Sequence, residues 1–263
     1  MGDRVTFELE KDGQNGLITA LSPRKNYIIR KSINLSRQAH IIAANIDQAF
    51  LIVTLASPRT SLGFIDRFLV TAEAYSVPAA LIFNKMDLFG PEEIEILSQI
   101  RKIYEKIGYP CYETSAVAGT AIETIRQLLS GKVTLLSGHS GVGKSSLINA
   151  LLPDMDIRTN EISDWSSKGQ HTTTFAEMHA LPQGGYIIDT PGIRELGIID
   201  IDKEELGHFF PEIFECSNGC RFNNCQHIRE PGCAVIEAVA QGIIARSRYE
   251  SYLSIYHGND TRA

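Results

Sequence analysis

A glycine-rich loop lies near the middle of the chain, at Gly138–Ser145, and has the form G-x-x-x-x-G-K-[ST]. The apolar run 132–136 precedes it, and a helical pattern that starts at Ser146 follows it. In such strand–loop–helix units the backbone N–H groups turn inward around phosphates, and the helix N-terminus adds partial positive charge. The loop therefore predicts a phosphate site. A nucleotide domain normally opens with this loop, whereas here about half of the chain precedes it.

Each member of the loop has an expected role. Lys144 reaches the β and γ phosphates, and the Ser145 hydroxyl binds Mg²⁺. The rest of the loop and the first residue of the following helix are expected to contact the nucleotide as well: Gly138, His139, Ser140, Gly141, Val142, Gly143 and Ser146.

The composition is ordinary for a globular protein with a buried core, because hydrophobic residues make up 43% of the 263 residues and charged residues 21%. No apolar run approaches the roughly 20 residues of a membrane span, and no secretory leader is visible. We therefore expect a cytosolic protein with no membrane partner. The formal net charge of −6 argues against generic coating of nucleic acid. Local basic patches such as Arg24–Lys25 leave docking on RNA open.

Two kinds of pattern divide the chain. Residues 4–31 alternate apolar and polar side chains in short runs, which predicts two or three β-strands. From Ile46 onward, strand-length apolar runs alternate with helical patterns, which predicts a mostly parallel α/β sheet between helices. The expected strands are 49–55, 79–83, 109–113 and 132–136, and the expected helices are 62–75, 91–107, 121–129, 234–245 and 247–256. A hairpin is expected over 175–188.

Two short segments point to guanine. Asn84–Asp87 reads N-K-M-D and directly follows an expected strand. In an N-K-x-D loop the Asp carboxylate accepts hydrogen bonds from the N1–H and exocyclic amino group of guanine, a pattern that adenine cannot supply. Ser115-Ala116 follows the next strand and matches the loop whose backbone N–H accompanies guanine O6. The expected base-binding residues are Asn84, Lys85, Asp87, Ser115 and Ala116.

Two later segments would complete a GTP site. Asp189–Gly192 reads D-T-P-G, in which the Asp holds Mg²⁺, usually through water, and the Gly amide detects the γ-phosphate. A threonine of the polar stretch 168–174, Thr172 or Thr173, would complete the Mg²⁺ shell when GTP is bound. The expected catalytic residues are Lys144, Thr173, Asp189 and Gly192.

The order of these motifs is unusual. The base-binding segments come first, the phosphate loop follows, and the threonine stretch and D-T-P-G come last. The same sheet can form if the chain of an ordinary GTPase is cut and rejoined. The sequence therefore predicts a circularly permuted P-loop GTPase domain.

A cysteine-rich segment near the C-terminus predicts a metal site. The spacing Cys220-x4-Cys225-x-His227-x5-Cys233 supplies three thiolates and one imidazole, which suits tetrahedral zinc. By spacing alone Cys216 could replace Cys220, and reduced thiols or a redox pair are the alternative to a metal. We expect one structural zinc ion.

The permuted order, the run Gly-Gln-His-Thr-Thr-Thr at 169–174 and the cysteine segment 220–235 together closely resemble the bacterial RsgA (YjeQ) family. The resemblance implies a GTPase that converts GTP to GDP with Mg²⁺, is stimulated by the small ribosomal subunit and acts late in its maturation. It implies the subunit and its rRNA as partners, and we expect a monomer. It also implies three parts: a partial OB-fold with its first strands missing at 1–35, the permuted GTPase domain at 36–200 and a helical zinc-binding domain at 201–263.

Two positions depart from what a self-sufficient GTPase needs. Some family members carry a histidine proposed as catalytic where this chain has Asp200, and an aliphatic side chain, Ile193, follows Gly192. We therefore expect slow intrinsic hydrolysis, with the ribosomal partner supplying or ordering the missing group. Two alternatives stay open: a nucleotide-stabilised RNA-binding scaffold with incidental turnover, and a permuted GTPase that serves the large subunit.

Overall fold

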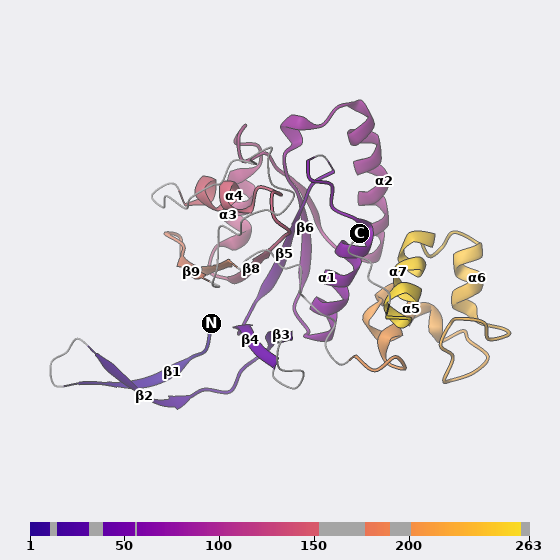
Figure 1. The fold of residues 1–263 in the computed structure, drawn as a ribbon, viewed down its shortest axis with the longest axis horizontal. Coiled ribbons are helices and arrows are strands. Elements are labelled where there is room, and N and C mark those ends of the chain that lie inside the picture. Colours follow the sequence, from indigo (N-terminus) through magenta and orange to yellow (C-terminus); the bar gives the residue numbers. More distant parts are fainter. Residues whose placement is uncertain (11–14, 32–38, 56, 153–176, 190–200, 259–263) are drawn as a thin grey trace.

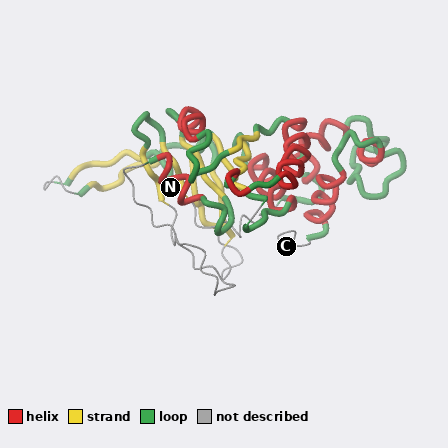
Figure 2. The backbone as a smooth tube through the Cα atoms, turned by 90° about the horizontal axis from the view of Figure 1, so that it is seen from above, coloured by secondary structure: helices red, strands yellow, loops and turns green. Residues whose placement is uncertain are grey.

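The computed structural model describes residues 1–10, 15–31, 39–55, 57–152, 177–189 and 201–258. Their arrangement is elongated, with a central α/β body, a β-hairpin that extends from one end and a small helical unit at the other (Figures 1 and 2). No helix within these ranges has the length and apolar character that crossing a membrane requires.

The body is built on a sheet whose strand order is β7-β6-β5-β8-β10-β9. Its strands are β5 (Gln48–Val53), β6 (Ala79–Phe83), β7 (Cys111–Glu113), β8 (Val133–Ser137), β9 (Glu177–Ala180) and β10 (Tyr186–Asp189). The edge strand β9 is antiparallel to β10, and all other neighbours are parallel. The predicted mostly parallel sheet and the predicted 175–188 hairpin are therefore confirmed, with the hairpin strands at β9 and β10.

Helices cover both faces of this sheet (Figure 1). On one face, α1 (Leu62–Ala74) and α2 (Pro91–Ile107) pack against Leu51 and Val53 of β5. On the other, α3 (Ile122–Leu129) and α4 (Lys144–Leu151) pack against Phe50 and Ile52. All four β5 side chains are at most 3% exposed, which explains why the strand is a continuous apolar run rather than an alternating one.

Local sequence signals set the ends of the helices on the first face. Ser61 caps α1 by accepting a hydrogen bond from the Phe64 backbone N–H. Helix α2 begins at Pro91, and the Glu93 carboxylate accepts from the Gly90 N–H at 2.9 Å. It ends at Ile107 and is followed by the cap residue Gly108, whose φ of 111° is left-handed. These signals are why the predicted bounds of α2 agree with the structure residue for residue.

The N-terminal strands form two separate antiparallel pairs. Strands β1 (Val5–Leu9) and β2 (Gly16–Leu21) make the extended hairpin, in which every strand residue is exposed. Strand β3 (Tyr27–Lys31) pairs with β4 (Ala39–Ala44). Two or three strands were predicted in residues 4–31 and the structure has three, β1, β2 and β3, whereas β4 was not predicted. It pairs with β3 across the boundary that we expected at residue 35.

The C-terminal unit contains the short helix η2 (Leu206–Phe209) and helices α5 (Pro211–Ser217), α6 (Ala234–Ala240) and α7 (Arg246–Tyr256). Its apolar core includes Val70 of α1, so the unit packs directly on the α/β body. Helix α6 ends five residues before the predicted residue 245. The reason is Gly242, whose φ of 72° turns the chain toward α7.

Candidate nucleotide site and metal centre

The sheet brings the nucleotide motifs to one edge. Asn84 follows β6, Ser115 lies just beyond β7, Gly138 follows β8, and Asp189 ends β10. Because these strands are parallel, their carboxyl ends meet at the same edge, where open α/β sheets bind ligands. Segments separated by about a hundred residues in the sequence thus become neighbours.

Two glycines of the phosphate loop are required by its geometry. Gly143 has φ of 88°, and a Cβ there would lie 2.5 Å from the Asn84 side-chain nitrogen. At Gly138 a Cβ would lie 2.8 Å from the Ile52 carbonyl oxygen of β5. Both contacts are shorter than van der Waals distance, so any larger residue would push the loop away from the neighbouring strands.

Asn84 joins the base segment to the phosphate loop. Its side-chain amide donates to the Val142 carbonyl at 2.9 Å, and its side-chain carbonyl accepts from the Thr114 hydroxyl at 3.1 Å. The residue is 1% exposed, so these two bonds satisfy polar atoms that water cannot reach. Asn84 therefore holds the predicted base segment at a fixed position against the predicted phosphate segment.

Asp87 and Ser115 also meet. The Ser115 hydroxyl donates to the Asp87 carboxylate and accepts from the Ala118 backbone N–H at 3.0 Å. Ser115 is buried, whereas Asp87 is exposed. Ala116, the next residue after Ser115, is half-buried. A carboxylate oriented by a buried hydroxyl, yet open to solvent, can accept hydrogen bonds from a base.

Lys85 contacts the loop between β5 and α1. Its backbone is left-handed, with φ of 65°, and its ammonium donates to the Ser57 carbonyl at 2.6 Å. Burial lowers the pKa of Lys85, and Asp87 opposes that shift. The residue thus links the base segment to the loop between β5 and α1.

Lys144 and Asp189 form a buried ion pair. Lys144 is the first residue of α4, and Asp189 is the last residue of β10. Each neutralises the other in a place where an unpaired charge would be costly. Ser145, next along α4, is only half-buried, so water can still reach its side chain. This set of side chains fits a phosphate and a hard cation such as Mg²⁺.

Several expected residues lie outside the described ranges. These are Thr172, Thr173 and Gly192. Conversely, the structure shows a neighbour of the phosphate loop that the sequence did not predict: the Thr60 hydroxyl lies 2.7 Å from His139 Nε2. No local pattern around Thr60 marks this contact, because it depends on two strands being adjacent in the sheet.

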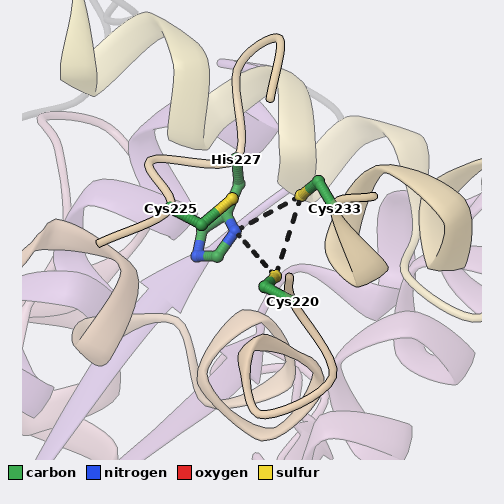
Figure 3. A group of neighbouring side chains, drawn as sticks. All are labelled: Cys220, Cys225, His227 and Cys233. Atoms are coloured by element: carbon green, nitrogen blue, oxygen red, sulfur yellow. Dashed lines mark hydrogen bonds between the residues drawn. The ribbon is translucent and has the colours of Figure 1, made fainter. Parts of the chain in front are cut away.

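The four expected zinc ligands lie together. The ligand atoms of Cys220, Cys225, His227 and Cys233 are all within 4.8 Å of one another. His227 Nδ1 is 3.6 Å from the Cys220 sulfur and 3.5 Å from the Cys233 sulfur, as Figure 3 shows. Burial lowers the pKa of His227, which favours the neutral imidazole that binds metals. Four converging S and N donors in a tight loop fit tetrahedral zinc.

Groups around the cluster hold its loop in shape. The Glu230 carboxylate accepts from the backbone N–H groups of Gln226 and Ile228, both at 2.8 Å. Burial opposes the charge on Glu230, but these backbone bonds prevail and lower its pKa to about 2. From α7, Tyr249 donates to the His227 carbonyl at 2.6 Å, and Tyr252 donates to the Gln226 carbonyl at 2.8 Å. Such supporting contacts orient metal ligands.

The remaining cysteines lie outside the cluster. Cys216 is on α5 and packs against the apolar core of the C-terminal unit. Cys111 is on β7, where burial raises the pKa of its thiol to about 12. Among the described residues, the set within mutual reach contains Cys220 rather than Cys216.

Comparisons with known proteins agree with this geometry. A family model described as RsgA GTPase matches residues 21–199. A protein of Bacteroides fragilis (strain YCH46) named small ribosomal subunit biogenesis GTPase RsgA is 54% identical over 255 residues, covering 97% of this chain and 82% of the relative. A protein of the same name from Christiangramia forsetii is 50% identical over 262 residues, covering 99% of this chain and 83% of the relative.

Two solved structures share the arrangement. YjeQ from Thermotoga maritima superposes with a TM-score of 0.81 at 37% identity, covering 100% of this chain and 84% of that one. YloQ, described as a circularly permuted GTPase, gives a TM-score of 0.75 at 32% identity, covering 98% of this chain and 79% of that one. The predicted circular permutation is thereby confirmed.

Proposed function

This chain belongs to the RsgA family of GTPases, and from that premise we propose that it hydrolyses GTP to GDP while assisting late maturation of the small ribosomal subunit (30S). The observation that carries the proposal is the hydrogen bond between Asn84 and Val142. It holds the proposed base-binding segment against the proposed phosphate loop, which follows that segment in the chain instead of preceding it. The names of the relatives point to the small subunit.

The base and phosphates have separate binding residues in this proposal. Asp87 accepts the two guanine donors, Ser115 orients Asp87, and the backbone of Ala116 accompanies the guanine carbonyl. The backbone N–H groups of Gly138–Ser146 surround the phosphates at the start of α4.

The buried ion pair suggests how the catalytic residues change partners. With nucleotide bound, Lys144 would pair with phosphate oxygens instead of Asp189, and the Asp189 carboxylate would then be available to hold Mg²⁺ together with Ser145. Thr173 and Gly192 are assigned to the GTP-dependent completion of this shell. Mg²⁺, when bound, neutralises charge that develops on the phosphates.

The C-terminal ligand set is proposed to hold one structural zinc ion. Zinc would be held by four donors, Cys220, Cys225, His227 and Cys233, which is the number typical of a structural rather than a catalytic site. A bound ion would cross-link the loop that carries these residues, and its binding free energy would stabilise the folded C-terminal unit.

Turnover depends on the partner in this proposal. Ile193 follows Gly192 and cannot orient a water molecule, so the small subunit supplies or orders the missing group. The chain acts as a monomer on the rRNA of the subunit, in the cytoplasm, where ribosomes are assembled. We assign the parts to residues 1–35, 36–200 and 201–263 as a partial OB-fold, the GTPase domain and the zinc domain.

Lys144→Ala distinguishes an enzyme from a scaffold. We expect the variant to lose GTP hydrolysis and the ability to restore subunit maturation in cells that lack the protein. Full maturation by a variant without turnover would instead support a scaffold. Co-sedimentation with separated subunits tests the partner, since binding to the large subunit alone would contradict the proposal.

A further inference from the structure

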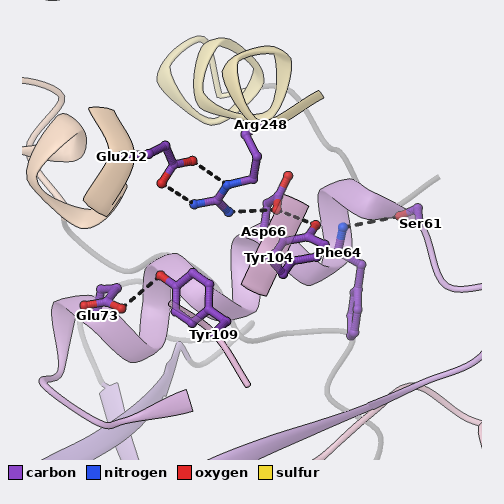
Figure 4. A network of polar contacts seen from close by, with 8 residues as sticks. All are labelled: Ser61, Phe64, Asp66, Glu73, Tyr104, Tyr109, Glu212 and Arg248. Atoms are coloured by element: carbon purple, nitrogen blue, oxygen red, sulfur yellow. Dashed lines mark hydrogen bonds and ion pairs between the residues drawn. The ribbon is translucent and has the colours of Figure 1, made fainter. Parts of the chain in front are cut away.

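A buried arginine fastens the zinc-binding unit to the GTPase domain (Figure 4). Arg248 of α7 donates through Nη1 to Asp66 of α1 at 2.8 Å, and through Nε to Glu212 of α5 at 2.6 Å. The Arg248 side chain is 1% exposed, and Asp66 is fully buried. Tyr104 of α2 also donates to Asp66, at 2.7 Å.

The start of α1 lies against the phosphate loop. The hydroxyl of Thr60, in the turn that leads into α1, lies 2.7 Å from His139 Nε2, and Thr60 is 3% exposed. One turn further, the Phe64 ring meets the His139 ring edge-on at 5.6 Å between centroids. Ser61 between them caps α1. The beginning of α1 is therefore in contact with a residue of the nucleotide loop.

The loop between β5 and α1 is itself held in place. The Thr54 N–H donates to the Thr60 hydroxyl at 3.1 Å, and the Thr60 N–H donates to the Thr54 carbonyl at 2.8 Å. Lys85 of the base segment reaches the Ser57 carbonyl of the same loop. Both halves of the nucleotide site thus contact one short segment, which continues directly into the helix that carries Asp66.

We infer that α1 couples the nucleotide site to the zinc-binding unit, with Thr60–His139 as the contact at one end and Asp66–Arg248 as the contact at the other. Nucleotide binding restricts the motion of His139 and of the turn at Thr60, and therefore of α1. Helix α7 is restricted in turn, because the buried Arg248 cannot replace its bond to Asp66 with bonds to water. Thr60 and Arg248 are positioning residues in this account. The inference rests on the phosphate loop binding guanine nucleotide, as proposed above.

The packing of α1 against α7 favours coupling between the nucleotide site and the zinc-binding unit. The contact between α1 and α7 is both apolar, through Val70 in the core of the C-terminal unit, and ionic, through Asp66. A buried charge pair is displaced only at high cost, so a shift of α1 moves its partner rather than breaking the bond. Asp66 and Glu212 raise the pKa of Arg248 although burial alone would lower it, so the guanidinium stays charged.

The test uses the whole chain of 263 residues, loaded with zinc, and fluorescent GDP. Thr60→Val keeps the shape of the side chain and removes the hydroxyl, and Arg248→Lys keeps the charge and removes the forked contact to Asp66 and Glu212. We expect each single variant to weaken GDP binding about 3- to 10-fold, and the double variant to weaken it no more than the stronger single one. If the losses of GDP binding free energy in the two single variants add up in the double variant, the inference is overturned.

Hydrogen exchange distinguishes coupling from a purely structural role of Thr60, because only coupling makes exchange in 246–256 respond to GDP. In the wild type, GDP should slow exchange in 246–256, and Thr60→Val should abolish that slowing while zinc content stays the same. Arg246→Lys is the matched control on α7, because Arg246 is exposed and pairs within the helix, with Glu250 at 2.8 Å. Equal exchange in 246–256 with and without GDP would contradict the coupling.

Three further outcomes are distinguishable. If Arg248→Lys fails to fold, the exchange comparison between wild type and Thr60→Val still decides the question. If the wild type binds no GDP, the proposed function fails. If the wild type binds GDP normally but the variants behave additively, only the coupling fails.

Discussion

Asn84 donates its side-chain N–H to the carbonyl of Val142 at 2.9 Å, and this bond joins segments that are 58 residues apart in the chain. Gly143, the next residue of the phosphate loop, leaves room for it, since a Cβ there would lie 2.5 Å from the same nitrogen. One buried hydrogen bond thus joins the segment predicted to bind the base to the loop predicted to bind phosphate, and only glycine at position 143 leaves room for it.

Gly143→Ala tests this relationship. The new methyl group would displace Asn84 and would also strain a residue with φ of 88°, so we expect destabilisation of about 1–3 kcal/mol and loss of GDP binding. Gly184→Ala is the matched control, because Gly184 has φ of 84° and a Cβ added there would meet nothing within 4 Å. Thermal unfolding and GDP titration of both variants separate the two effects, because both substitutions strain the backbone but only Gly143→Ala brings a methyl group against Asn84. Retained GDP binding in Gly143→Ala would refute the account.

Asp87→Asn tests guanine recognition. Asparagine keeps an oxygen that can accept from Ser115, so the loop should persist, but its amide group repels one of the two guanine donors. We expect affinity for GDP to fall roughly 10- to 100-fold and preference to shift toward xanthosine diphosphate. Competition titrations with GDP, XDP and ADP give the measurement. An unchanged preference for GDP would place the base elsewhere.

Glu230→Gln tests how the zinc loop is supported. A neutral amide has one acceptor oxygen in place of the two that now accept from Gln226 and Ile228. We expect zinc affinity to fall by about 10-fold or more. Glu237→Gln, at an exposed position of α6, serves as the control and should bind zinc normally. Competition with a chelating dye measures both, and equal affinities would show that Glu230 does not support the site.

Cysteine substitutions test the identity of the ligands. Cys220→Ser should lose zinc and unfold the C-terminal unit, whereas Cys216→Ser should retain about one zinc ion per chain. Metal analysis by mass spectrometry measures the zinc content of both variants. Zinc lost from Cys216→Ser and retained by Cys220→Ser would make Cys216 the ligand instead of Cys220.

The Cys111 thiol should be unreactive. After zinc is removed with a chelator, Cys111 should remain slow to alkylate, because burial raises its pKa to about 12.

The parts of the fold that sequence predicts well are those set by local signals. Helix α2 is predicted residue for residue because Pro91, Glu93 and Gly108 mark its ends. Strand β6 is predicted equally well because it is a short apolar run directly before N-K-M-D. Strand β4 was missed, since Ala39–Ala44 is weakly patterned and its partner β3 determines its pairing.

The same distinction applies to the site. The loops expected to bind phosphate, base and zinc each have a compact sequence signature, so the sequence alone predicts which of their residues bind. The Thr60–His139 and Asp66–Arg248 contacts have no such signature, because their partners are 79 and 182 residues apart. They exist only once the sheet and the helices have packed. Contacts of this kind depend on the tertiary fold and not on any local pattern.

Turnover of GTP with and without purified small subunits shows whether hydrolysis by this chain depends on the small ribosomal subunit, as proposed above. Because Ile193 cannot orient water, we predict slow intrinsic hydrolysis and stimulation by at least about 100-fold when small subunits are added. Large subunits and Lys144→Ala provide the controls, and neither should give stimulated turnover. Equal turnover with and without small subunits would contradict the account.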